Sequence, residues 1–184
     1  MSKALKWTLI ITAGLLVFGV VAFNAMRMQA KKHSPELTVN YTREDIVLSV
    51  NYSRPSKKGR KIFDGLVPFG KVWRTGANEA TTFTTSRDLT IDGKVLPAGK
   101  YTLWTIPGLD TWTFIFNSKQ YGWGIGFDGE ASMDPTFDVL RTEVRVDRLL
   151  EPVEVLDITF DDSEALELVL EWDQTHVAVQ LSIK

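Results

Sequence analysis

An uncharged apolar run near the N-terminus constrains this chain more than any other feature. It covers residues 7–23 and reads WTLIITAGLLVFGVVAF. A run of about 17 residues lies at the short end of what a helix needs to cross the hydrocarbon core of a bilayer. Two lysines precede the run, and Arg27, Lys31 and Lys32 follow it. The sequence therefore predicts a transmembrane helix whose partner is the lipid bilayer, through residues 7–23.

Three interpretations of this segment stay open. An uncleaved signal anchor fits the length of the run and the lack of a clean small-residue cleavage site. A cleaved signal peptide fits the basic start, and a buried helix of a soluble protein fits the apolar composition. We adopt the signal anchor. The Lys and Arg tallies on the two sides are nearly even, and the short N-terminal tail favours a single-pass protein whose domain lies on the periplasmic or extracytoplasmic side.

The charge of the chain changes after the anchor. Residues 1–33 carry five Lys or Arg and no acid, so residues 34–184 have a formal net charge of −7. A net-negative domain has no general basic field for nucleic acid, and we expect no nucleic-acid partner. About 150 residues suffice for one folding unit with its own core. The predicted organisation is an anchor and polar tether at 1–33 and one β-rich domain at 34–184.

Apolar residues at every second position predict strands in this domain. Residues 46–52, 166–172 and 177–183 show this alternation, which places one set of side chains on a core face. The polar stretch Asp173–Thr175 predicts a hairpin turn between the last two runs. Further strands are expected at 79–85, 101–106, 112–116, 140–146 and 153–160.

Turn residues stand between these strands. Asp92-Gly93 predicts a tight hairpin, and Pro97-Ala98-Gly99 precedes the strand at 101–106. One short helical turn is expected within Asp134–Leu140. The predicted fold class is all-β: an antiparallel β-sandwich or barrel-like domain preceded by one N-terminal transmembrane helix.

The least strand-like stretch, Ser53–Thr81, is rich in basic residues. Local positive charge of this kind can receive a carboxylate, phosphate or sulfate group. The alternative, which we favour, is a solvated loop with one Arg paired to Glu79 at the sheet edge. The basic residues are Arg54, Lys57, Lys58, Arg60, Lys61, Lys71 and Arg74.

A compact set of polar groups lies at the end of this stretch. Arg74 offers a planar donor fork, Asn78 an amide and Glu79 a carboxylate, next to the indole of Trp73. Together they predict a binding site for a small anionic or polar ligand, with Trp123 at its edge. The alternative is a buried polar network that closes a loop onto the sheet.

Glycines separate the aromatic residues of Tyr121–Phe127, which reads YGWGIGF. Rings spaced in this way can lie flat at a surface and stack on a ligand, and this is the basis for including Trp123 in the site. The same pattern also fits a strand whose rings enter the core while glycine permits a bulge.

The sequence contains no recognisable catalytic motif. Its histidines are His33 and His176, it has no Cys, and it has neither a Gly-x-Ser-x-Gly elbow nor a phosphate-binding glycine loop. Acidic residues after Asp128 do not follow the spacing of a calcium-binding loop. We therefore expect no metal and no cofactor, and leave the catalytic residues unknown. The alternative function is a hydrolase or lyase in which Glu79 is the acid/base and Arg74 holds an anionic group.

Several motifs resemble an uncharacterised bacterial envelope family, the domain of unknown function number twenty-nine eleven. The longest is Arg54–Thr81, RPSKKGRKIFDGLVPFGKVWRTGANEAT, and the second is Leu96–Gly108, LPAGKYTLWTIPG. Shorter similarities lie at residues 112–117, 123–124 and 138–141. The resemblance implies an exported β-rich domain from about residue 40 to the end, and it implies no substrate. We expect a membrane-anchored binding or envelope-associated module.

Overall fold

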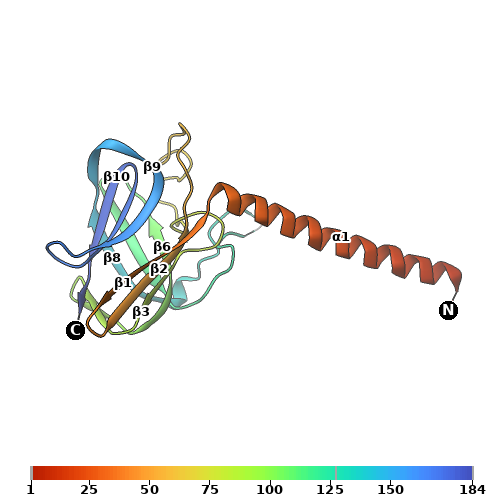
Figure 1. Cartoon of the computed structure of the whole chain (residues 1–184), viewed down its shortest axis with the longest axis horizontal. Coiled ribbons are helices and arrows are strands. Elements are labelled where there is room, and N and C mark those ends of the chain that lie inside the picture. Colours follow the sequence, from red (N-terminus) through yellow and green to blue (C-terminus); the bar gives the residue numbers. More distant parts are fainter. Residues whose placement is uncertain (1, 127, 184) are drawn as a thin grey trace. The chain divides into compact units, whose positions relative to one another are not determined.

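The computed structural model describes residues 2–126 and 128–183 (Figure 1). The helix α1 covers Lys3–His33, and none of its residues is buried. By length and composition it can cross a membrane, a test that a signal sequence near an N-terminus also meets. The helix continues through residues 24–33, which the sequence analysis assigns to the polar tether. Its last turn carries Lys31, Lys32 and His33. Basic side chains favour a helix C-terminus, because positive charge interacts favourably with the negative end of the helix dipole.

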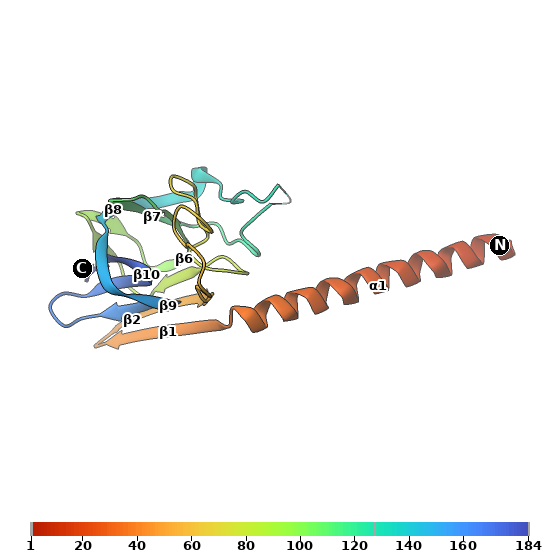
Figure 2. The same ribbon diagram turned by 90° about the horizontal axis from the view of Figure 1, so that it is seen from above.

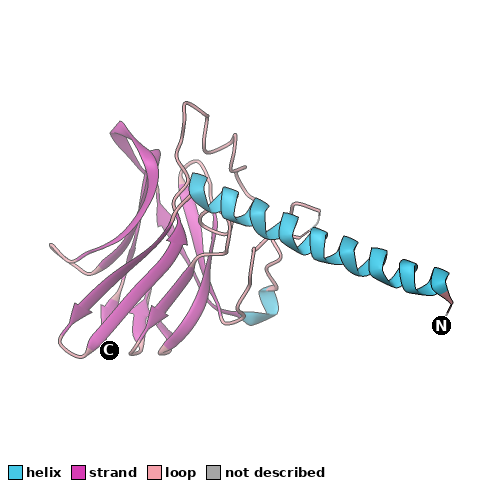
Figure 3. Cartoon of the chain, turned by 45° about the vertical axis from the view of Figure 1, so that its right-hand side comes forward, coloured by secondary structure: helices cyan, strands magenta, loops and turns pink. Residues whose placement is uncertain are grey.

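The chain divides into two compact units between His33 and Ser34. The second unit is built from β-strands (Figure 3). Within the described residues the strands are β1 Glu36–Arg43, β2 Ile46–Ser53, β3 Thr82–Thr85, β4 Leu89–Ile91, β5 Lys94–Leu96, β6 Gly99–Ile106, β7 Thr111–Asn117, β8 Asp138–Arg145, β9 Asp147–Asp161, β10 Glu167–Gln180 and β11 Ser182–Ile183. A short 3₁₀ turn, η1, covers Pro135–Phe137, inside the stretch where a helical turn was expected.

The strands form three antiparallel sheets. The largest has the order β1-β2-β3-β6-β7-β8, a second pairs β9 with β10, and a third has the order β11-β4-β5. The antiparallel all-β prediction is confirmed. Strands β1 and β8 are the two ends of the largest sheet and lie on opposite sides of the domain (Figure 2), so this sheet is not a closed barrel.

One hydrophobic core joins the three sheets. The alternation predicted for residues 46–52 is confirmed, because every second side chain of β2 is buried. Strands β9 and β10 contribute Leu156, Ile158, Leu170 and Trp172 to the same core, and β4 contributes Leu89. Because residues from all three sheets pack together, residues 34–184 have a core of their own.

The predicted hairpin at Asp173–Thr175 is wrong. Strand β10 runs without a break from Glu167 to Gln180 and pairs with β9 from Glu167 to His176, with register shifts on both sides of Asp173. Asp173 has a positive φ of 54°. These irregularities change the phase of the alternation, so that Trp172 before them and Val177 after them both face the core. A polar triplet therefore marks a bulge here.

The hairpin predicted at Asp92-Gly93 is confirmed. These residues join β4 to β5, and their φ angles of 51° and 71° are both in the left-handed region. Two-residue hairpins favour such angles because the turn then follows the twist of the strands.

We predict that Trp172→Asp strongly destabilises the separate domain 34–184. Trp172 is 1 % exposed, and its ring stacks on Trp73 at a centroid distance of 6.1 Å. The change removes this packing and buries a charge, so we expect a loss of at least about 4 kcal/mol in the free energy of unfolding. Urea unfolding measures it. Gln174→Asp adds the same charge at an exposed position of β10 and is the control; equal midpoints for both variants would contradict the assigned core.

Candidate functional site

An isolated antiparallel β-bridge between Trp73 and Thr105 of β6 determines which way the predicted site residues face. The backbone N–H of Trp73 donates to Thr105 O at 2.7 Å, and the N–H of Thr105 donates to Trp73 O at 3.0 Å. Directly opposed residues of an antiparallel pair share one face, and the next residues share the other. Trp73 therefore faces the core, whereas Arg74 and Trp104 face the outer side of the sheet.

Trp73 belongs to the core. Its ring lies against Phe63, Trp112 and Trp172, at centroid distances of 6.2, 6.2 and 6.1 Å. Its indole N–H donates to Gly76 O at 3.1 Å. The indole that stands next to Arg74 in the sequence is thus turned away from it.

Arg74 connects the segment around it to the glycine-aromatic stretch. Its Nη1 donates to Trp123 O at 2.8 Å, and the side chain is half-buried. Burial lowers the pKa of Arg74, and the nearby carboxylate of Glu79 opposes that shift. A guanidinium remains charged in proteins and offers five N–H donors. Among the described residues, no other hydrogen bond of this guanidinium is formed, so it retains donor capacity.

The two stretches singled out in the sequence meet at this point. The N–H of Ala80 donates to Gly122 O at 3.0 Å. Gly124 has a φ of 76°, and a Cβ atom there would lie 3.0 Å from Ala80 Cβ and 3.2 Å from Arg74 Cβ. Close backbone approach thus requires glycine at position 124. Phe127, the last residue of the YGWGIGF stretch, lies outside the described residues.

A second hydrophobic cluster lies on this outer face. Its buried members are Ala80, Trp104 and Ile115, and Tyr121 packs its ring edge-on to Trp104 at 5.2 Å. Trp104 is 0 % exposed, and its Nε1 has no hydrogen-bond partner among the described residues. Sequence reasoning missed Trp104 as a site residue. The available signal was that β6 carries apolar residues toward both faces, which indicates a covered sheet.

Asn78 and Glu79 have different surroundings. Asn78 is buried with a φ of 59°, and its amide donates to Ser34 O at 3.0 Å, so it fixes the first residue of the domain. Glu79 is half-buried and lies near enough to Arg74 to influence its pKa. Of the five predicted ligand-binding residues, the structure brings Arg74, Glu79 and the backbone of Trp123 together.

Most of the basic segment is paired with acids. Arg54 contacts Asp157 at 2.8 Å, Lys61 contacts Asp64 at 2.8 Å, and Lys71 contacts Glu130 at 3.7 Å. Lys57 pairs with Asp173. Lys58 and Arg60 form no ion pair with the described residues. The local positive charge is therefore mostly compensated, and Arg74 differs from the other cations by its burial.

The described residues contain no group of three or more His, Cys, Asp or Glu side chains that could hold a metal ion. His176, the histidine of the domain, lies on β10 and contacts Glu171 Oε1 through Nδ1 at 2.8 Å.

Comparison with known proteins gives one match. Residues 34–181 match the model of a family described as "Protein of unknown function (DUF2911)". The chain belongs to the DUF2911 family. The match covers the β-rich unit from its first residue to Leu181 and confirms the resemblance carried by the motifs. No curated protein and no solved structure matches the chain.

We predict that Gly124→Ala loosens the outer face of the DUF2911 domain. A Cβ atom at φ 76° and 3.0 Å from Ala80 Cβ is strained, and we expect a loss of about 1–2 kcal/mol in the free energy of unfolding. Thermal unfolding of the separate domain measures it. Gly122→Ala is the matched control, since a Cβ atom there meets nothing within 4 Å. Equal losses for the two variants would contradict the close approach of this loop to Arg74.

Proposed function

We propose that this protein is a membrane-anchored module of the cell envelope. In this proposal α1 is a signal anchor, and the DUF2911 domain is a β-sandwich on the extracytoplasmic side that binds a small anionic or polar ligand. The apolar, unburied helix supports the anchor. The pairing of the β-rich unit with such a helix supports a domain that works near a membrane.

One observation carries the binding part of the proposal: unused donors gather on the outer face of the largest sheet. The half-buried guanidinium of Arg74 and the buried indole N–H of Trp104 lie on the same face, because the β-bridge between Trp73 and Thr105 sets their residues opposite each other. A buried donor without an acceptor costs free energy, and an acceptor from a ligand removes that cost. Donors without acceptors favour a carboxylate or phosphate group.

Glu79 narrows the ligand class. Its carboxylate lies near enough to Arg74 to oppose the lowering of that pKa, so it competes with a ligand's anionic group for the guanidinium. Hydroxyl groups on the ligand would be tolerated beside this carboxylate, because a hydroxyl can donate a hydrogen bond. In this scheme Trp123 contributes its backbone position to the site. Trp73 and Asn78 support the segment from the core side and from the start of the domain.

The binding proposal is tested by ¹⁵N NMR of the separate domain, titrated with sodium acetate, sodium phosphate and sodium galacturonate. We expect the indole N–H signal of Trp104 to shift with the acid that binds, because that donor gains an acceptor. The indole of Trp172 already donates to Glu154 O and should stay unchanged. Shifts no larger than those in sodium chloride of equal ionic strength would overturn the proposal.

Two variants test whether the acid binds at Arg74 and Trp104. Arg74→Gln should reduce the affinity for the acid about tenfold or more, because it removes the charge-assisted hydrogen bonds. Trp104→Phe keeps a ring in the cluster and should weaken binding less. Lys71→Gln, which removes an exposed cation of the same segment, is the control and should bind like the unchanged domain.

The anchor is tested by fractionation. We expect the full chain to remain with membranes after washing at high salt and at alkaline pH, because only the loss of the bilayer releases a spanning helix. The separate domain 34–184 should be found in the soluble fraction. Recovery of a mature N-terminus near Asn24 or Met26 from cells would show cleavage and contradict the signal anchor.

A further inference from the structure

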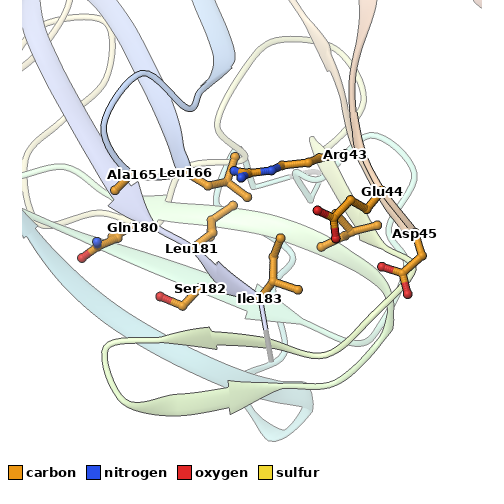
Figure 4. Close-up of a pocket in the computed structure, with 10 residues that line it drawn as sticks. Arg43, Glu44, Asp45, Ala165, Leu166, Gln180, Leu181, Ser182 and Ile183 are labelled. Atoms are coloured by element: carbon orange, nitrogen blue, oxygen red, sulfur yellow. The ribbon is translucent and has the colours of Figure 1, made fainter.

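A pocket of about 380 Å³ lies at one end of the domain (Figure 4). It is formed where β1 turns into β2 and where β10 passes into β11. Strand β1 separates it from Ser34, the first residue of the domain, so it lies at the other end of that strand. Its volume falls within the range of small-molecule sites.

The floor of this pocket is apolar and its rim is polar. The floor consists of Ile46, Leu166 and Leu181, which are 1 %, 8 % and 2 % exposed. Arg43 and Glu44 lie at the rim. An apolar floor beneath charged groups favours a ligand that has both an apolar part and charges.

The two rim charges are available to a ligand. In Figure 4 the guanidinium of Arg43 extends across the pocket toward Leu166, and the carboxylate of Glu44 is directed into the pocket. Neither side chain forms an ion pair with the described residues, whereas the neighbouring Asp45 pairs with Arg87. The pocket thus presents one cation and one anion at different points of its rim.

The backbone at Glu44 adds a separate observation. Its φ of 50° lies in the left-handed region, where glycine or asparagine is the usual residue of a tight turn. Arg43 pairs with Ile46, so Glu44 and Asp45 form the two-residue turn between β1 and β2, and such a turn favours this angle. The hairpin thus sets the point of the rim at which the Glu44 side chain leaves the backbone.

We propose that this pocket binds a small zwitterion with an aliphatic side chain, of the α-amino acid or short-peptide class. The carboxylate of the ligand lies on Arg43, its ammonium group on Glu44, and its side chain on Leu166 and Leu181. A simple anion is attracted by Arg43 but repelled by Glu44. A simple cation is attracted by Glu44 but repelled by Arg43, so both are disfavoured. The proposal is independent of the site around Arg74.

The test compares leucine with three analogues that each lack one feature. Leucinamide lacks the carboxylate, N-acetylleucine lacks the ammonium group, and glycine lacks the side chain. In methyl NMR titrations of the separate domain, leucine should shift the signals of Leu166 and Leu181. The affinity of each analogue should be lower than that of leucine by a factor of up to about five, as expected for one lost interaction at an exposed site. Equal affinities for all four compounds, or no shift at these methyl groups, would overturn the proposal.

Variants assign each charge to its partner. Arg43→Gln should abolish the preference for leucine over leucinamide and keep that over N-acetylleucine, and Glu44→Gln should do the opposite. Arg145→Gln and Glu143→Gln change exposed residues of the same types on β8 and should leave both preferences intact. Loss of both preferences in every variant would contradict the assignment.

Two further measurements distinguish a free amino acid from a peptide as the ligand, and test whether this pocket is independent of the site at Arg74. Leucyl-leucine is titrated beside leucine: tighter binding of the dipeptide assigns the pocket to peptides, and tighter binding of leucine assigns it to free amino acids. Arg74→Gln should leave leucine binding unchanged. If Arg74→Gln abolishes leucine binding, the two sites are not independent and the proposal fails, whatever the result of the acid titrations.

Discussion

Aromatic packing in the core determines how the irregular segment of this domain is held. Trp73 stacks on Trp172 of β10, and Phe63 lies edge-on to Trp112 of β7 at 4.8 Å. The segment that carries Phe63 and Trp73 has little regular structure of its own, so its position depends on these rings. Because Trp73 must point inward, its neighbour Arg74 must point outward. Packing on one side of the sheet thereby places a cation on the other side.

A polar contact joins the largest sheet to β9. The hydroxyl of Tyr52 on β2 donates to Asp157 Oδ1 at 3.0 Å and accepts from the N–H of Ile158 at 2.8 Å. Arg54 donates to the same carboxylate oxygen and to Leu156 O. The phenol of Tyr52 is a neutral donor at physiological pH, and burial raises its pKa further above the ordinary value. The contact holds β9 beside β2, and it explains why Arg54 is a structural cation.

The sequence predicted local features of this fold better than long-range ones. Alternation identified the core face of β2, and Asp92-Gly93 identified a hairpin, because both depend on neighbouring residues. The turn expected at Asp173 is a bulge, since turns and bulges use the same polar residues and differ only in what β9 pairs with. The long motif resembling a known family also placed the domain in its family, a conclusion that no single pattern reached.

The candidate site also depends on a long-range contact that the sequence did not predict. Trp73 and Arg74 are adjacent in the chain, which suggested one site, yet the pairing of Trp73 with Thr105 separates them onto opposite faces. The same pairing brings Trp104 beside Arg74, across thirty residues of sequence that contain no local signal of the contact.

Burial rather than the number of basic residues distinguishes the two candidate sites. Most cations around Arg74 have acidic partners, so their sum produces little field, and the selectivity that we propose for this site comes from a half-buried guanidinium beside a buried indole N–H. Desolvated donors favour an acceptor strongly because water does not compete for them. Arg43 is exposed, where a single charge contributes little. A ligand there gains affinity only by meeting Arg43, Glu44 and the apolar floor together, so such a site requires a zwitterion, whereas the site at Arg74 can bind a simple acid.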